Sequence, residues 1–251
     1  MFDYTAPDNL LNNKVILVTG AGDGIGRAAA LRFAELGATV ILCGRTVNKL
    51  ESVYDEIEAK SLPQPAIIPV NLEGATEKDY NDIAVAIENS FGRLDGLLHN
   101  ASQLGSLTSI EQYEAEVWTK VMQINVHAGF LLTKALIPLL RLSEDASIVF
   151  TSSSVGRKGR AFWGAYSVSK FATEGMMQIL ADELDDDVDS EHHAIRVNSI
   201  NPGATRTNMR ASAYPAENPI HNPEPNEIMP VYAYLMGKDS KGVTGQAFNA
   251  Q

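Results

Sequence analysis

A tyrosine and a lysine stand four positions apart in the run Tyr166-Ser167-Val168-Ser169-Lys170. On a helix, side chains at this spacing share one face, so the phenol and the ammonium group would lie side by side. A free tyrosine has a pKa of about 10, and a neighbouring cation favours the phenolate. We therefore expect Lys170 to lower the pKa of Tyr166, which would act as a general acid or base.

Ser153 stands 13 positions before Tyr166, directly after the apolar segment Ser147–Phe150 that reads as a strand. Ligands of open α/β sheets bind at the carboxyl ends of strands, where a serine hydroxyl can bond a substrate oxygen. A tyrosine–lysine pair alone would also fit an ordinary surface pair. The serine upstream favours an acid–base site built from all three side chains.

A glycine-rich run, residues 19–26, reads Thr-Gly-Ala-Gly-Asp-Gly-Ile-Gly between a predicted strand and a predicted helix. Gly20, Gly24 and Gly26 permit a tight turn, close approach of a pyrophosphate, and close packing of the helix on the strand. The unpaired N–H groups and the dipole of the helix N-terminus attract phosphates. The run therefore predicts a dinucleotide site.

The second predicted strand ends at Gly44 and Arg45, where a fold that selects NAD usually places an acid for the ribose 2′-hydroxyl. Gly44 removes that acid, and the guanidinium of Arg45 suits a 2′-phosphate. We therefore expect NADP(H) to be preferred over NAD(H), although Arg45 would also fit a solvated loop. Asp23 argues the other way, because no basic neighbour is evident on that side of the glycine run.

Short apolar segments alternate with amphipathic ones along the whole chain, which predicts a parallel sheet covered by helices on both faces. No repeat or linker divides the 251 residues, so we expect one α/β domain. The predicted strands are 15–18, 39–43, 66–70, 94–99, 147–150 and 195–200, and the predicted helices are 25–36, 49–59, 77–91, 112–142 (broken or kinked near Pro138) and 166–184. Residues 204–230, which hold Pro215, Pro219, Pro223 and Pro225 and show little periodicity, read as a structureless loop, either a substrate lid or a plain surface loop.

The net charge of −11 argues against a sequence-independent nucleic-acid binder, which needs clustered Lys and Arg. One cysteine, Cys43, allows no internal disulfide, and neither a signal peptide nor an apolar run long enough for a membrane span is evident. These features favour a cytoplasmic protein without a membrane partner. His192 and His193 lack the spacing of metal ligands, so no metal site is expected.

With these motifs, the sequence resembles the short-chain dehydrogenase/reductase family along nearly its whole length. The resemblance rests on the glycine spacing, on Ser153 with Tyr166 and Lys170, on His99-Asn100-Ala101-Ser102, on Asn125, and on the segment from Asn201 to Thr207. It implies a single-domain doubly wound parallel sheet of the Rossmann type, with carbonyl reduction or alcohol oxidation as the activity. Within the family, the chain is most similar to bacterial oxidoreductases of unknown substrate.

The resemblance also implies a role for each matching residue. Tyr166 would donate the proton, Lys170 would assist it and hold the nicotinamide ribose, Ser153 would bond the carbonyl, and Asn125 would hold a relay water. The implied cofactor contacts are Gly20, Gly22, Asp23, Gly24, Ile25, Gly26, Arg45, Asn71, Leu72, Asn100, Ala101, Tyr166, Lys170, Pro202, Gly203, Thr205 and Thr207. A homodimer or homotetramer formed through the long helices is implied as well.

Four questions stay open. A nucleotide-sensing binding protein would need the glycine loop and Arg45 but not the catalytic residues. An enoyl-thioester reductase normally has a wider tyrosine–lysine spacing. The basic side chains Arg157, Lys158 and Arg160 would either meet an anionic substrate or lie solvated in a loop, and Phe162 and Trp163 would either line a pocket or pack beneath that loop.

Overall fold

The computed structural model describes residues 1–185 and 195–251, and within them seven strands form one parallel sheet in the order β3-β2-β1-β4-β5-β6-β7. The strands are β1 (Val15–Thr19), β2 (Thr39–Gly44), β3 (Ala66–Pro69), β4 (Gly96–His99), β5 (Ala146–Thr151), β6 (Ile195–Asn201) and β7 (Ala247–Asn249). The chain runs outward from β1 to β3 and then crosses to β4. The switch point between β1 and β4 is where such sheets bind ligands.

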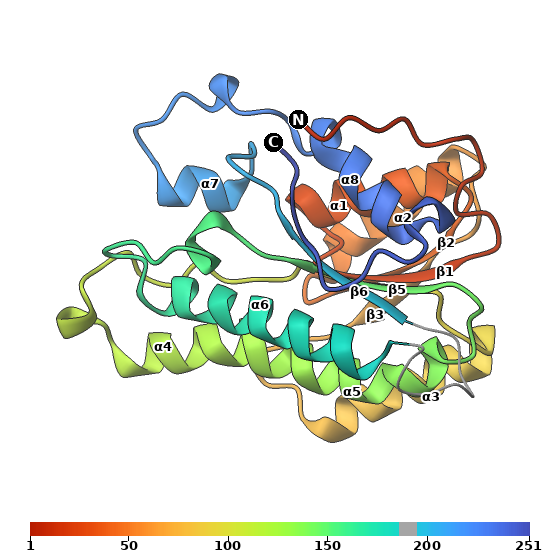
Figure 1. Ribbon diagram of the computed structural model, residues 1–251, viewed down its shortest axis with the longest axis horizontal. Coiled ribbons are helices and arrows are strands. Elements are labelled where there is room, and N and C mark those ends of the chain that lie inside the picture. Colours follow the sequence, from red (N-terminus) through yellow and green to blue (C-terminus); the bar gives the residue numbers. More distant parts are fainter. Residues whose placement is uncertain (186–194) are drawn as a thin grey trace.

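Helices cover both faces of this sheet (Figure 1). They are α1 (Gly24–Glu35), α2 (Val47–Ala59), α3 (Glu77–Phe91), α4 (Ala115–Met122), α5 (Ala128–Leu140), α6 (Gly164–Glu183), α7 (Asn208–Ala213) and α8 (Met229–Met236). One layer holds α1, α2 and α8, and the other holds α3, α4, α5 and α6. The doubly wound α/β fold expected from the alternating pattern is confirmed.

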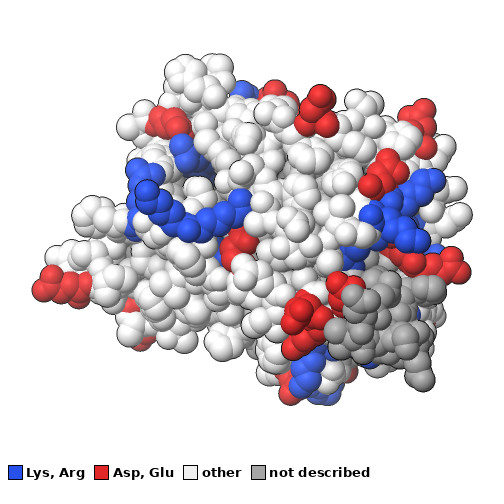
Figure 2. Space-filling model, in the orientation of Figure 1, with Lys and Arg blue, Asp and Glu red and all other residues white. Residues whose placement is uncertain are grey.

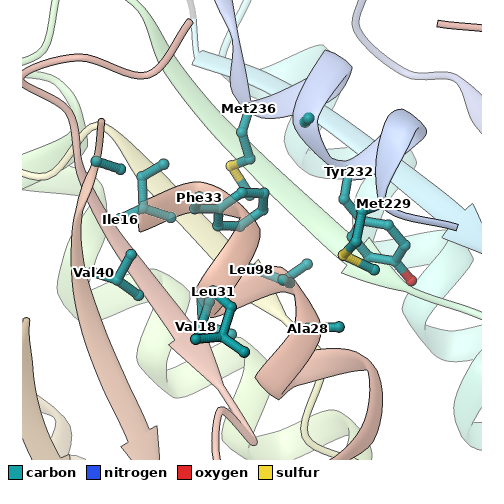
Figure 3. Packing of buried hydrophobic residues seen from close by; sticks show 14 of the residues in the cluster. Ile16, Val18, Ala28, Leu31, Phe33, Val40, Leu98, Met229, Tyr232 and Met236 are labelled. Carbon is teal, nitrogen blue, oxygen red and sulfur yellow. The ribbon is translucent and has the colours of Figure 1, made fainter. Parts of the chain in front are cut away.

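The alternation of side chains along β1 explains why the sheet has two separate cores. Ile16 and Val18 point into a cluster with α1 and α8, whereas Val15 and Leu17 point into a cluster with α3, α5 and α6. Figure 3 shows the first cluster, in which Phe33 of α1 packs close to Ile16 and Met236. Burial on both faces is what makes the strands read as continuous apolar runs.

The helix expected to break near Pro138 is instead continuous from Ala115 to Leu140. Pro138 lies in the last turn of α5 and is exposed, so solvent can hydrate the carbonyl whose hydrogen bond the proline removes. The irregularity occurs earlier, as a π-helical turn at Gln123–His127. This helix is long and apolar enough to cross a membrane, but the core helices of soluble proteins meet the same criteria of length and mean hydropathy. Here Leu132 and Leu136 of the helix are buried against the sheet.

The prediction that residues 204–230 lack regular structure is wrong. The segment contains α7 and two short 3-10 turns, Pro219–His221 and Pro225–Ile228, and its last two residues begin α8. Pro219, Pro225 and Pro230 each occupy the first turn of a helical element. In the first turn the missing N–H of proline costs nothing, so these residues start helices here and do not prevent them.

Candidate active site

The glycine loop between β1 and α1 has the tight geometry that its sequence predicts. Gly20 and Gly24 adopt left-handed backbone conformations, with φ of 68° and 52°. A Cβ atom on Gly26 would lie 2.2 Å from the carbonyl oxygen of Gly20 and 2.5 Å from Nδ2 of Asn100. The loop, the start of α1 and the end of β4 are therefore packed as closely as backbone atoms allow.

Thr19, at the end of β1, links the glycine loop to the end of β4. Its hydroxyl donates to the carbonyl of Leu98 and accepts from the backbone N–H groups of Asn100 (2.9 Å) and Ala101 (3.1 Å). Sequence reasoning did not single out Thr19, although a hydroxyl residue directly before the glycine run was the available signal. These bonds fix the two strand ends on either side of the switch point.

Asp23 caps the N-terminus of α1 and, contrary to the sequence-based expectation, has a basic neighbour. Its carboxylate accepts from Gly24 N (2.8 Å) and forms a salt bridge with Lys49 of α2 at 2.5 Å. Hydrogen bonding to Lys49, opposed by partial burial, lowers the pKa of Asp23. Lys49 was missed because it lies 26 residues away and approaches only when α2 packs beside the loop. The apparent argument against NADP(H) is therefore removed.

A cavity of about 510 Å³ runs along the carboxyl ends of the strands, and nearly all the predicted site residues line it. These residues are Gly20, Gly22, Asp23, Gly24, Ile25, Arg45, Asn71, Leu72, Asn100, Ala101, Ser153, Tyr166, Lys170, Pro202, Gly203, Thr205 and Thr207. Gly26 lies beneath the loop, and Asn125 lines a second, smaller cavity that also reaches Lys170. The residues thus come together from both ends of the chain.

Tyr166 and Lys170 occupy the same buried face of α6, as their spacing predicts. The Nζ atom of Lys170 lies 5.5 Å from the centroid of the Tyr166 ring and donates to the carbonyl of Thr151 at 2.7 Å. Ser153, just after β5, lines the same cavity, and its side chain favours the phenolate of Tyr166 and so acts to lower its pKa. The strand end and the helix therefore present one serine, one tyrosine and one lysine to the same space.

The electrostatics of this cluster differ from the expectation that Lys170 lowers the tyrosine pKa. Burial raises the pKa of Tyr166 to about 12, and the hydrogen bond from Ser153 only partly opposes this. Burial also lowers the pKa of Lys170 to about 8, against the opposing effect of Glu174. Both shifts arise because burial disfavours the charged form of each group.

Asn125 lies in the π-helical turn and joins two parts of the site. Its Oδ1 accepts from Gln103 N at 2.8 Å, while its Nδ2 donates to the Gln103 carbonyl and to Ser169 Oγ at 2.9 Å each. These three bonds connect the segment after β4 to α6. The small cavity beside Asn125 is also lined by Thr151 and Lys170.

Arg157 is partly buried in an ion pair and is not among the residues that line the cavity. Its guanidinium donates to buried Glu174 at 2.9 Å and to Asn249 of β7 at 2.9 Å. The other carboxylate oxygen of Glu174 accepts from Ser199 of β6 at 2.7 Å. This network ties α6 to the last two strands, which corrects the interpretation of Arg157 as a loop charge.

The remaining expectations concern a metal and the thiol. Within residues 1–185 and 195–251, no group of three His, Cys, Asp or Glu side chains is arranged to hold a metal ion, and His192 and His193 lie outside the described residues. Cys43 is fully buried in β2, and burial raises the pKa of its thiol to about 12. A thiol with so high a pKa is not a reactive thiolate.

Comparison with known proteins identifies the family. The model of the short chain dehydrogenase family matches residues 14–218, most of the chain. The chain belongs to the short-chain dehydrogenase/reductase family. Members of this family include an oxidoreductase of Escherichia coli K12, YciK, which is 51% identical over 99% of this chain and 96% of its own length.

Solved structures of other short-chain dehydrogenases agree with this assignment. One from Pseudomonas syringae is 61% identical, with a TM-score of 0.97 and full coverage of both chains. Another, from Shigella flexneri 2a strain 301 in complex with NADP, is 52% identical, with a TM-score of 0.93 over 98% of this chain and all of that one. The fold class and the resemblance deduced from the motifs are both confirmed.

The close approach at Gly26 generates a stability prediction. Gly26→Ala should lower the free energy of unfolding by about 1–3 kcal/mol, since the new methyl group overlaps the Gly20 carbonyl and the Asn100 amide. Gly175→Ala is the control, because a Cβ there meets no atom within 4 Å, and alanine in a helix stabilises by up to about 1 kcal/mol. Chemical denaturation of both variants is the measurement, and equal effects at the two positions would contradict the packing argument.

Proposed function

We propose that this protein is an NADP(H)-dependent oxidoreductase that interconverts a carbonyl compound and an alcohol, with Tyr166 as its general acid/base. The observation that carries the proposal is the placement of Ser153, Tyr166 and Lys170 in the same cavity as the glycine loop. Hydride transfer to a carbonyl requires a proton donor next to a dinucleotide-binding site, and here both lie at the switch point of the sheet.

The cavity fits a phosphorylated dinucleotide. The glycine loop brings backbone N–H groups close to the cavity at the N-terminus of α1, which suits a pyrophosphate, and the Asp23 carboxylate that caps this helix is paired with Lys49. Arg45 lines the cavity and has no carboxylate partner among the described residues, which leaves its guanidinium for a 2′-phosphate. Ser102 and Ser152 line the cavity, and in the described part of the chain their buried hydroxyls have no hydrogen-bond partner.

The proposed cofactor contacts follow the cavity from one end to the other. Arg45 would hold the 2′-phosphate, Asn71 and Leu72 the adenine edge, Asn100 and Ala101 the central part, and Tyr166 with Lys170 the nicotinamide ribose. Pro202, Gly203, Thr205 and Thr207 would hold the nicotinamide. When bound, NADPH supplies the hydride, and the protein orients it. The Shigella flexneri relative in complex with NADP supports this choice of cofactor.

Tyr166 is suited to give a proton to the substrate oxygen. With its pKa raised to about 12, the phenol stays protonated at neutral pH, as a donor must. Ser153 would hydrogen-bond the same oxygen and stabilise the charge that develops on it. The cavity of about 20 Å³ beside Asn125, Thr151 and Lys170 has room for one water molecule. Through that water, the proton that Tyr166 donates could be replaced.

The sensor alternative has less support. A protein that only binds NADP(H) needs the glycine loop and Arg45, whereas this chain also buries a tyrosine and a lysine together, beside Ser153, at a cost in desolvation. A binding protein gains nothing from that cost, whereas an acid–base catalyst requires those groups.

Tyr166→Phe should keep the fold and most of the affinity for NADPH, whose other proposed contacts remain, but lower kcat by about 10²–10⁴-fold, because the acid/base oxygen is removed. Steady-state kinetics of NADPH oxidation on a panel of ketones and aldehydes is the measurement. Tyr80→Phe is the matched control, since it removes the same atom from a buried tyrosine of α3 outside the cavity. Near-normal kcat in Tyr166→Phe would overturn the mechanism and favour the sensor alternative.

Arg45→Ala should weaken NADPH binding by about 10- to 100-fold and leave NADH binding nearly unchanged, because a charge-assisted contact contributes about 1.5–3 kcal/mol. Fluorescence titration of both cofactors gives the affinities. Arg32→Ala on α1 makes the same charge change away from the cavity and should alter neither. Equal affinity of the wild type for the two cofactors would refute the preference.

We also propose that the segment 204–230 acts as a lid, with α7 as its moving part. Met209, Arg210 and Ala213 line the cavity, and Asn208 donates to Asp23 of the glycine loop at 3.1 Å. Amide hydrogen exchange should therefore slow in α7 when NADPH binds, while the buried α8 keeps its protection. Unchanged exchange in α7 would count against a lid.

The homodimer or homotetramer expected from the family resemblance stays a prediction. It is supported by exposed apolar side chains on the two long helices named for it, Phe130 of α5 and Val168, Phe171 and Ile179 of α6. Large exposed apolar side chains close together are typical of protein–protein contacts.

A further inference from the structure

An aromatic and cationic stack extends from Tyr166, through Trp163 of the cavity wall, to the exposed Arg160. The ring of Trp163 lies 5.8 Å from that of Tyr166 and 5.9 Å from that of Tyr214, which follows α7. The guanidinium carbon of Arg160 lies 6.0 Å from the Trp163 ring centroid and 5.9 Å from that of Tyr214. Arg160 Nη1 also donates to the Tyr214 hydroxyl at 2.7 Å. One indole ring therefore separates Arg160 from the phenol of Tyr166.

Arg160 differs from the other arginines around this end of the cavity in having no counter-ion. Arg157 pairs with Glu174, Arg206 with Glu224, and Arg210 with Glu217 through two bonds of 2.7 Å. No acidic side chain in residues 1–185 and 195–251 pairs with Arg160, although the chain carries a net charge of −11. Figure 2 shows Lys and Arg side chains gathered around a hollow near the position of α7 in Figure 1.

The wall of the cavity between these groups is largely apolar. Leu104, Ile124, Trp163, Met209 and Ala213 line the same cavity as Tyr166. A ligand whose carbonyl reaches Tyr166 would lie along this wall and end near Arg160. A guanidinium held on aromatic faces is pre-oriented, and its donor geometry matches a carboxylate.

We propose that the substrate is a carbonyl compound that carries a carboxylate, with Arg160 binding the carboxylate and Trp163 packing against the apolar segment between the two groups. This inference rests on the proposed function, since it assigns the substrate class of the same site. The step is the one already described: hydride adds to the carbonyl carbon, and the Tyr166 proton goes to its oxygen. Arg160 determines specificity and takes no part in that transfer.

The test compares acids with their own esters. Straight-chain oxo-carboxylates with a graded series of methylene spacers, and the matching methyl esters, are offered with NADPH, and kcat/KM is measured for each. We expect the wild type to favour the acid by about 10- to 100-fold at the best spacer length, the value of one charge-assisted contact. Arg160→Gln should bring the ratio of acid to ester toward one, chiefly through KM. Lys158→Gln, an equal charge change two positions earlier, should keep the wild-type ratio.

Each outcome decides the proposal. An ester reduced as well as its acid, or a ratio lowered equally by Lys158→Gln, overturns the role of Arg160. If neither is reduced, calorimetry with the saturated carboxylate of each length and the protein–NADPH complex separates the two claims. Binding that Arg160→Gln abolishes supports the carboxylate site and counts against the proposed reaction. Absence of binding overturns the carboxylate site, whatever the fate of the reaction.

Discussion

A buried ammonium group, that of Lys170, sets the arrangement of the catalytic end of this protein. A charged group can be buried only if it is paired or hydrogen-bonded. Lys170 bonds the carbonyl of Thr151 at the end of β5, and Glu174, one turn further along α6, supplies the opposing charge. Because these two partners belong to a strand and to the helix itself, the need to satisfy one amine fixes α6 against the sheet.

Glu174 needs polar partners for the same reason as Lys170. That carboxylate is buried as well, and it is shared between Arg157 and Ser199 of β6. Arg157 in turn reaches Asn249 and the carbonyl of Phe248 in β7, the last strand of the sheet. Residues that touch neither the cofactor cavity nor Tyr166 therefore hold the tyrosine in place, and the C-terminal strand is part of the support of the active site.

The elements and the centre of the site could be predicted because their signals are local. A strand followed by glycines, an amphipathic helix and a Tyr–Lys spacing of four are all readable within about ten residues. The salt bridge between Asp23 and Lys49, the π-helical turn at Asn125 and the Arg157–Glu174 pair depend on tertiary packing between distant segments. Burial likewise reversed the expected direction of the Tyr166 pKa, because the sequence shows the neighbouring cation but not the loss of water around the phenol. The prediction for residues 219–230 was wrong for a different reason. Proline is disfavoured inside a helix but favoured in its first turn, and the sequence alone does not show which of the two applies.

The two unpaired arginines, Arg45 and Arg160, also bear on how fast ligands arrive. In the part of the chain that the structure describes, Arg45 lines the cavity, Arg160 lies beside Trp163 of its wall, and neither has a carboxylate partner, in a chain of net charge −11. At low ionic strength the field of the whole chain repels an anionic dinucleotide before it reaches them. At physiological ionic strength the Debye length is about 8 Å, so the distant acidic groups are screened while an arginine in contact with the ligand is not. Moderate salt therefore eases the encounter with an anion here, the reverse of what a uniformly basic binding face would give.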